Sequence, residues 1–179
     1  MNIIILGHIN SGKSETAKYI QEKYGYTIYS LGDGVKNFIV DMFAILHEIN
    51  PEKYETIELN DLYNRDTKED YRKHMQLIAT DLCRRYFGSD VWINYLKQKL
   101  IYSSKYIIDD IRFKSEYEAF KHSAVSIRLI RDCELSSNHI SEHELDDIVA
   151  NYNIINNGSI NDLHLMIDKI MREISANFY

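Results

Sequence analysis

The chain has 179 residues, which is enough for one compact domain with a sizeable core but too few for two ordinary domains. Its 21 basic residues stand against 27 acidic ones, and the net charge of −6 argues against a protein that coats nucleic acid with a basic face. Only two cysteines are present, no apolar run approaches the roughly 20 residues that span a bilayer, and no signal-peptide pattern is seen, so we expect a cytoplasmic protein.

The first part of the chain predicts two strands and two helices. Ile3 to Leu6 is a continuous apolar run, as expected of a parallel strand that is covered on both faces. Residues 13–24 carry apolar side chains at helical spacing, and Gly25 follows as a helix stop. Residues 27–29 are a short strand candidate, and apolar residues between 35 and 46 repeat at the spacing of a further helix.

The middle of the chain predicts two more helices and a buried strand. A long helical pattern covers residues 71–86, and a shorter one follows over residues 91–100. The next buried-strand candidate is Tyr106-Ile107-Ile108, and it ends in two carboxylates, Asp109 and Asp110.

The last part of the chain completes an alternation of strands and helices. Residues 116–121 have a helical pattern, and residues 124–130 and 152–155 are strand candidates on either side of the polar, irregular stretch 131–143. Apolar residues between 159 and 174 then recur at helical spacing. The alternation predicts an α/β protein: a three-layer sandwich with a central parallel sheet of about five strands, helices on both faces and a short lid.

One motif points directly to phosphate binding. The segment Gly7-His8-Ile9-Asn10-Ser11-Gly12-Lys13-Ser14 is an intact G-x-x-x-x-G-K-S sequence between an apolar strand and a helix, the context that a P-loop requires. Its backbone N–H groups and the positive end of the following helix attract phosphate oxygens. Lys13 supplies charge to the β- and γ-phosphates of ATP, and the Ser14 hydroxyl can bind Mg²⁺. The alternative is a glycine-rich turn without a ligand. The expected nucleotide contacts are Gly7, Asn10, Ser11, Gly12, Lys13, Ser14 and Glu15.

Two kinds of charged residue are candidates for the rest of the site. A carboxylate that follows a buried strand lies at the edge of the sheet where phosphates bind, so Asp109 and Asp110 both qualify as partners of Mg²⁺. Alternation places these two side chains on opposite sides, so we expect only one of them to face the site. Asp33 is another candidate, which can meet an acceptor or orient an arginine. The alternative for each is a loop carboxylate that caps a helix.

A polar stripe accompanies an apolar stripe on the helix expected over residues 71–86. The polar stripe is Arg72, Gln76, Thr80 and Arg84, and the apolar stripe is Met75, Ile78, Ala79 and Leu82. Such a helix suits the side of a cleft, and the planar fork of arginine binds phosphate through two hydrogen bonds. The alternative is a solvated face with surface arginines.

Three further arginines can supply positive charge near the transferred group. Arg112 lies two residues after Asp110, and Arg128 and Arg131 lie near the end of the strand expected over residues 124–130. Phosphoryl transfer requires positive charge over the equatorial oxygens, so we expect some of these arginines to converge.

Several local patterns occur together in a fixed order. After the P-loop come Leu31-Gly32-Asp33-Gly34-Val35-Lys36, then Arg72, Gln76, Thr80-Asp81 and Arg84, Asp90-Val91-Trp92, Asp110-Ile111-Arg112-Phe113 with Glu116, His139-Ile140-Ser141-Glu142, and Tyr152 to Ser159. This series resembles the deoxynucleoside monophosphate kinases of tailed phages, a branch of the nucleoside monophosphate kinase family.

The resemblance implies an organisation and a set of roles. It implies one P-loop kinase domain over residues 1–179, with an acceptor-binding segment at about 31–88 and a lid at about 131–143. The implied acceptor contacts are Asp33, Lys36, Arg72, Gln76 and Arg84. The implied catalytic residues are Lys13, Arg112 and Arg131, and the implied Mg²⁺ ligands are Ser14 and Asp110.

The activity implied is ATP-dependent phosphorylation of a deoxynucleoside monophosphate to the diphosphate, by in-line transfer of the γ-phosphoryl group with Mg²⁺. A small nucleotide acceptor is expected, with no membrane and no stable nucleic-acid partner. Family analogy adds a homodimer and, for a phage-encoded protein, the host-cell cytoplasm. Two alternatives stay open: a kinase of another small phosphorylated metabolite or modified nucleobase, and a nucleotide-binding regulator without turnover.

Overall fold

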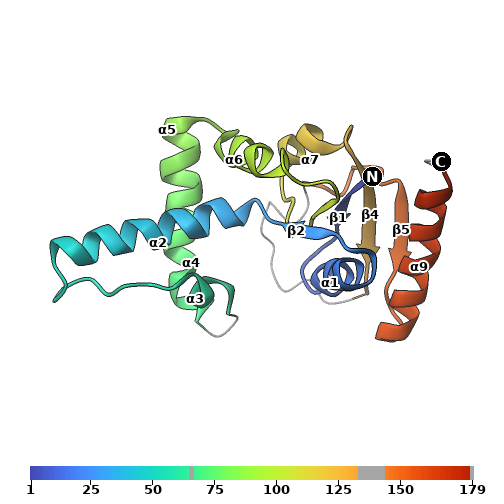
Figure 1. Ribbon diagram of the computed structural model, residues 1–179, viewed down its shortest axis with the longest axis horizontal. Helices are drawn as coiled ribbons and strands as arrows, with labels where there is room; N and C mark the ends of the chain where they lie inside the picture. Colours follow the sequence, from blue (N-terminus) through green and yellow to red (C-terminus); the bar gives the residue numbers. More distant parts are fainter. Residues whose placement is uncertain (65–66, 133–143, 178–179) are drawn as a thin grey trace. The chain divides into compact units, whose positions relative to one another are not determined.

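The computed structural model describes residues 1–64, 67–132 and 144–177, and the chain forms two compact units (Figure 1). The first unit combines Met1–Ser30 with Lys99–Tyr179, and the second unit is Leu31–Gln98. All five strands that the structure describes belong to the first unit, and the elements of the second are helical. The unit that carries the phosphate loop is therefore assembled from both ends of the sequence.

The sheet of the first unit is parallel throughout. Its strands are β1 (Asn2–Leu6), β2 (Thr27–Tyr29), β3 (Tyr106–Ile108), β4 (Ala124–Ile130) and β5 (Tyr152–Ile155). They pair in the order β2-β3-β1-β4-β5, so β1 is the middle strand, with Ile3 opposite Ile107 on one side and Val125 on the other. The α/β class and the five-stranded parallel sheet predicted from the sequence are confirmed.

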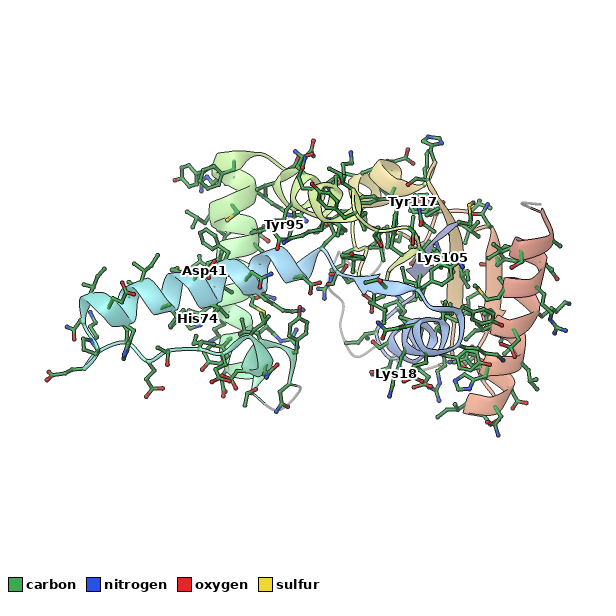
Figure 2. All side chains as sticks on the ribbon, in the orientation of Figure 1. Lys18, Asp41, His74, Tyr95, Lys105 and Tyr117 are labelled. Atoms are coloured by element: carbon green, nitrogen blue, oxygen red, sulfur yellow. The ribbon has the colours of Figure 1, made fainter. Side chains whose placement is uncertain are left out.

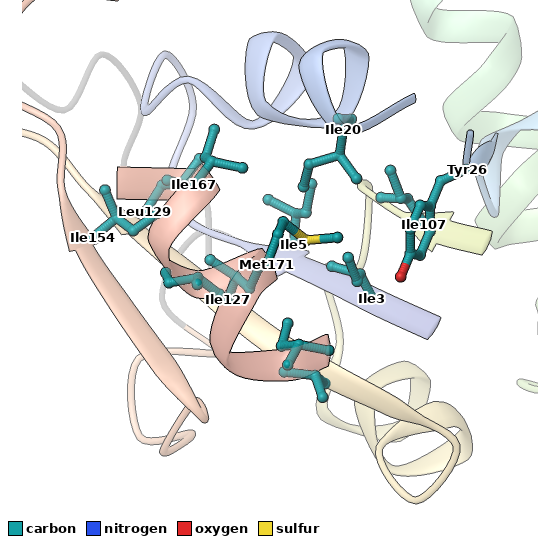
Figure 3. Close-up of a cluster of buried hydrophobic side chains, with 14 of the residues drawn as sticks. Ile3, Ile5, Ile20, Tyr26, Ile107, Ile127, Leu129, Ile154, Ile167 and Met171 are labelled. Atoms are coloured by element: carbon teal, nitrogen blue, oxygen red, sulfur yellow. The ribbon is translucent and has the colours of Figure 1, made fainter. Parts of the chain in front are cut away.

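Helices cover one face of this sheet with the main apolar core. Alternate residues of a strand point to opposite faces, and Ile3 and Ile5 of β1 point to the face covered by α1 (Lys13–Tyr24) and α9 (Ile160–Asn177). Figure 3 shows this cluster, in which Ile20 and Ile167 come from the two helices. Each isoleucine buried here contributes about 1.5–3 kcal/mol relative to an exposed one.

The opposite face of the sheet packs against α7 (Lys114–Phe120). Tyr117, labelled in Figure 2, comes from this helix, and its hydroxyl lies 3.4 Å from the hydroxyl of Ser126 on β4. Ser126 stands between Val125 and Ile127, which belong to the other face, so the contact places α7 across the sheet from α1 and α9. This burial on both sides explains why Ile3 to Leu6 form an unbroken apolar run with no exposed surface.

The second unit is built on one long helix. Its elements are α2 (Gly32–Ile49), α3 (Leu59–Tyr63), α4 (Lys68–Gln76), the π-helix η1 (Leu77–Arg84) and α5 (Arg85–Phe87), and α6 (Val91–Leu100) runs past its end. Helix α2 packs against α3, α4 and η1. The indole N–H of Trp92 donates to the carbonyl oxygen of Ala79 at 3.1 Å and holds α6 on η1.

The sequence predicted a single α-helix over residues 71–86, and this prediction is wrong about the type of helix. The helix begins at Lys68, and its middle is π-helical rather than α-helical. A π-helix has more residues in each turn, so the buried position moves along the sequence. Cys83, with 2% of its surface exposed, occupies the core position that the α-helical pattern assigned to Leu82, which is 40% exposed.

One carboxylate joins α9 to the end of α1. Asp168 Oδ1 accepts hydrogen bonds from the hydroxyls of Tyr19 at 2.8 Å and Tyr24 at 2.7 Å, and Oδ2 accepts one from Lys23 Nζ at 2.7 Å. The hydrogen bond from Lys23 is the main reason that the pKa of Asp168 falls from 3.8 to about 2. The network fixes the two helices that cover the apolar core.

This network predicts a pH dependence of stability. The pKa of Asp168 is lower in the folded protein than in the unfolded one, so its contribution is complete above about pH 4 and is lost as the pH falls towards 2. We expect Asp168→Asn to lower the urea midpoint at neutral pH and to flatten the decline between about pH 5 and pH 2. Asp147→Asn is the control, because this side chain is 86% exposed. A decline as steep in Asp168→Asn as in the wild type would contradict the assignment.

Candidate active site

The turn between β1 and α1 needs backbone angles that few side chains allow. Gly7, Asn10 and Gly12 have φ angles of 145°, 62° and 102°, and glycine adopts positive φ freely while asparagine tolerates it better than most residues. A Cβ atom at Gly7 would lie 2.6 Å from the carbonyl oxygen of Leu129. The turn therefore presents backbone rather than side chains, as a phosphate-binding loop requires.

The polar side chains of this loop differ in their surroundings. Lys13 is half-buried, and its Nζ atom donates to the carbonyl oxygens of Gly7 at 2.7 Å and His8 at 2.8 Å. Ser14 is exposed. The hydroxyl of Ser11 is buried and has no hydrogen-bond partner among the described residues. Because buried hydroxyls are usually paired, this orphan hydroxyl indicates a place where a ligand oxygen fits.

The carboxylates predicted to follow β3 lie at the same edge of the sheet as the loop. Asp109 and Asp110 are both half-buried. The hydroxyl of Ser30, which directly follows the neighbouring strand β2, donates to Asp110 Oδ2. Since parallel strands end at one edge, Ser30, Asp110 and the loop after β1 all follow strand ends of that edge. Sequence reasoning missed Ser30, because a single serine after a short strand carries no signal.

Arg112 stands on a turn that a buried carboxylate shapes. Its side chain is exposed, and its backbone N–H donates to Glu116 Oε2 at 2.8 Å. The N–H of Phe113 donates to the same oxygen at 3.1 Å, and Glu116 is only 2% exposed. Glu116 thus fixes the backbone of the residue that carries the Arg112 guanidinium.

Two side chains near the phosphate loop contact neighbouring elements. His8 Nε2 lies 3.1 Å from Asp146 Oδ1. Glu15 Oε1 lies 3.0 Å from His164 Nε2, and the ring of His164 stacks on Tyr19 at 3.7 Å between centroids. The carboxylate of Glu15 therefore ties α1 to α9.

Arg128 and Arg131, close together in the sequence, differ in what they contact. Arg128 Nη2 donates to the carbonyl oxygens of Leu145 at 2.6 Å and Ile148 at 2.8 Å, so its guanidinium holds the chain that leads into β5. Arg131 is exposed just beyond β4. The rest of the predicted lid, residues 133–143 with His139, Ser141 and Glu142, lies outside the described residues.

In the second unit, Asp33 and Lys36 form a compact cluster with Tyr63. Lys36 is only 8% exposed, and its Nζ lies 3.2 Å from Asp33 Oδ1 and 3.6 Å from the centre of the Tyr63 ring. The Tyr63 hydroxyl donates to Asp33 Oδ1 at 2.5 Å. Sequence reasoning placed Asp33 and Lys36 on one segment but missed Tyr63, one of 14 tyrosines in the chain.

The remaining predicted acceptor residues lie along α4 and η1. Arg72 and Gln76 are exposed on α4, and Arg84 is half-buried at the end of η1. A step of four residues goes slightly beyond one α-helical turn but falls short of one π-helical turn. The drift around the helix therefore reverses at η1, which keeps these three side chains on one side.

A separate apolar hollow of about 340 Å³ lies in the second unit. Its lining residues are Met42, His74, Leu77, Ile78, Asp81 and Leu82. None of the predicted acceptor residues is among them. The predicted acceptor residues therefore do not line this hollow.

The residues that could bind a magnesium ion can be compared with what this ion usually requires. No cluster of three His, Cys, Asp or Glu side chains with metal-binding geometry occurs within residues 1–64, 67–132 and 144–177. Magnesium usually keeps several waters and takes one or two protein ligands together with substrate phosphates. The hydroxyl of Ser14 and the carboxylate of Asp110 are hard oxygen donors of that kind.

In the second unit, burial raises the pKa of the Cys83 thiol, which keeps this cysteine protonated.

The parallel sheet and the loop after its central strand define a P-loop nucleotide-binding fold, and solved structures share this fold. Dephospho-CoA kinase from Campylobacter jejuni superposes with a TM-score of 0.52 at 17% identity, over 99% of this chain and 98% of that chain. Shikimate kinase from Acinetobacter baumannii, in complex with shikimate, gives 0.50 at 15% identity, over 99% and 94%. At such identities the likeness establishes the shared fold.

A family comparison is more specific. The family model described as deoxynucleotide monophosphate kinase matches residues 48–167, more than half of the chain, and the protein belongs to this family. It is accordingly a phosphotransferase for a nucleotide or small metabolite. The matched range excludes the phosphate loop, so the loop and the family match support the kinase class independently. No curated protein matches the chain at a significant level.

The helices give one finding about membranes. In the part of the chain that the structure describes, none of them has the length and hydrophobicity needed to cross a bilayer.

The loop geometry predicts unequal effects of two glycine substitutions. Gly12 and Gly25 both have positive φ, so alanine at either position costs about 1–2 kcal/mol of unfolding free energy. A Cβ at Gly12 would also lie 2.6 Å from Asn156 Nδ2, whereas nothing lies within 4 Å at Gly25. We expect Gly12→Ala to lose at least about 1 kcal/mol more than Gly25→Ala in urea denaturation. Equal losses would show that the loop is not tightly packed at Gly12.

Proposed function

We propose that this protein transfers the γ-phosphoryl group of ATP to a deoxynucleoside monophosphate, with Mg²⁺, and so forms the diphosphate. The observation that carries the proposal is a complete phosphate loop in a chain whose residues 48–167 match the deoxynucleotide monophosphate kinase family. The loop supplies the site for the donor nucleotide, and the family supplies the class of acceptor.

The donor phosphates bind at the loop in this proposal. The backbone of Gly7, Asn10, Ser11 and Gly12 curls around them, and the first N–H groups of α1, including that of Glu15, point towards them. Lys13 exchanges the carbonyl oxygens of Gly7 and His8 for β- and γ-phosphate oxygens, a better match for its charge. Because the carboxylate of Glu15 pairs with His164, Glu15 contacts the phosphates through its backbone N–H.

Ser14 and Asp110 are the residues that would hold Mg²⁺. The hydroxyl of Ser14 is exposed beside the loop, and the hydrogen bond from Ser30 orients the Asp110 carboxylate. Bound Mg²⁺ supplies neutralisation of the charge on the phosphate oxygens. Between the two candidates after β3, the hydrogen bond from Ser30 and the motif that Asp110 shares with Arg112 favour Asp110.

Positive charge over the transferred group comes from arginine. Arg112 is exposed two residues after Asp110, on the turn held by Glu116, and Arg131 is exposed beyond β4. In-line transfer spreads negative charge over the phosphoryl oxygens, which guanidinium groups stabilise. The acceptor phosphate is already anionic at neutral pH, so positioning and charge neutralisation suffice without a strong general base.

The acceptor binds residues of the second unit. Asp33, Lys36, Arg72, Gln76 and Arg84 all belong to Leu31–Gln98. The ion pair of the buried Lys36 with the half-buried Asp33 gives a preorganised polar group, and the arginines suit the acceptor phosphate. The proposal treats residues 1–179 as one kinase domain with its acceptor-binding segment at about 31–88. The lid at about 131–143 and a homodimer stay predictions.

The experiment that tests the function is an assay of ADP release with ATP–Mg²⁺ and a panel of ribo- and deoxynucleoside monophosphates. We expect turnover with one or a few deoxynucleotides, and Lys13→Ala should lower that turnover at least about 100-fold. Lys18→Ala is the matched control, because Lys18 lies on the exposed side of α1, with its Nζ 3.9 Å from Glu22 Oε1 (Figure 2). ATP binding without turnover on any acceptor would favour a regulator, and equal rates for both lysine variants would reject the mechanism.

The acceptor assignment predicts a selective change in KM. Arg72→Ala removes a charge-assisted contact with the acceptor phosphate, so the KM for the monophosphate should rise about tenfold while the KM for ATP stays constant. Arg85→Ala, in α5, is the control and should change neither constant, because Arg85 is exposed and is not among the proposed acceptor contacts. An acceptor KM that does not respond to Arg72→Ala would remove this residue from the site.

A further inference from the structure

Asn156, the residue after β5, is buried beside the phosphate loop. It is 5% exposed, and its side-chain Nδ2 donates to the carbonyl oxygen of Ser11 at 2.9 Å. Its own backbone N–H donates to the carbonyl oxygen of Ile130, the last residue of β4, at 2.7 Å. A chain of two hydrogen bonds therefore connects the end of the sheet to the middle of the loop.

The loop is packed against this side chain without spare room. A Cβ atom at Gly12 would lie 2.6 Å from Asn156 Nδ2, closer than van der Waals contact allows. Glycine at position 12 thus serves two requirements, a positive φ of 102° and the close approach of Asn156. Both requirements arise from the protein's own atoms, so the contact between Asn156 and the loop does not depend on a bound nucleotide.

The hydrogen bond determines the orientation of a whole peptide group. A trans peptide is planar, and its C=O and N–H bonds point in opposite directions. When Asn156 draws the Ser11 carbonyl towards itself, the N–H of Gly12 is directed away from Asn156. The carbonyl of Gly12 is held in turn by the N–H of Thr16 at 2.9 Å, in the first turn of α1. The backbone on both sides of Gly12 is therefore fixed before any ligand binds.

We propose that Asn156 is a positioning residue for the phosphates of the donor nucleotide, acting through the Ser11–Gly12 peptide. Its amide holds the loop in the conformation that presents the Gly12 N–H to a phosphate oxygen. The inference rests on the proposed function, because it assumes that this loop binds ATP. It assigns to Asn156 a role in the affinity for ATP and no role in binding the phosphoryl acceptor.

The chemistry of the contact requires the amide of asparagine. Ser11 offers a carbonyl oxygen, which needs a donor, so the carboxylate of aspartate would face it with repulsion instead of a hydrogen bond. Alanine would leave the buried carbonyl unpaired. Asn157 provides a matched control in the same turn: it is exposed, and its side chain bonds with Asp132 rather than with the loop.

The test measures ATP–Mg²⁺ binding by titration calorimetry, together with both KM values, for the wild-type protein and three variants. We expect Asn156→Ala and Asn156→Asp each to weaken ATP binding about tenfold or more, with an unchanged KM for the acceptor. Asn157→Ala should bind ATP as the wild type does. A purely structural role would lower the folded fraction and kcat while leaving both KM values unchanged.

The outcomes separate this inference from the proposed function. Wild-type protein that binds no ATP overturns the proposed function itself. Wild-type binding that persists in folded Asn156→Ala and Asn156→Asp overturns the role of Asn156. Failure of both variants to fold, seen by circular dichroism, would also reject it, because the residue would then serve the fold as a whole. If the KM for the acceptor rose together with the KM for ATP, the effect of Asn156 would not be confined to the phosphate loop, and the proposal would be contradicted.

Discussion

The site depends on how the chain leaves the central strand of the sheet. β1 is buried on both faces, so the chain must turn at its end and enter α1 through a loop with little room for side chains. Positive φ angles at Gly7, Asn10 and Gly12 make that turn, and they leave backbone donors where an anion can approach. Because the neighbouring strands are parallel, Asp110 and Arg112 follow a strand that ends at the same edge.

The loop is held by contacts that come from distant parts of the sequence. Asn156 holds the Ser11 carbonyl, and His8 meets Asp146 in the segment before β5. Lys13 closes on carbonyl oxygens of the loop itself. These contacts hold the loop in place in the free protein, and in the proposed function phosphate oxygens would replace the neutral carbonyl oxygens that Lys13 contacts. Such preorganisation lowers the ordering cost of binding.

In the second unit, a change from α-helical to π-helical winding determines where side chains lie around the helix. The π-helix η1 puts Cys83 in the core in place of Leu82, and it reverses the drift of residues spaced by four. Arg72, at the α-helical end, and Arg84, at the π-helical end, therefore stay on one side. The segment also buries Lys36 against Asp33, a pair whose partners lie one turn apart on α2. The Lys36 side chain is 10% exposed and the Asp33 side chain 28%, so this pair is partly shielded from water.

Local pattern in the sequence determined the class of fold and the phosphate loop, because strand burial, helix spacing and glycine positions act over a few residues. The five strands, the loop from Gly7 to Ser14 and the kinase family could all be predicted in this way. Tertiary structure alone decided which groups meet: Ser30 at Asp110, and Asn156 at Ser11, 145 residues away. It also decided the π-helical winding of η1. These features depend on strand order and on packing between distant segments, which no local pattern encodes.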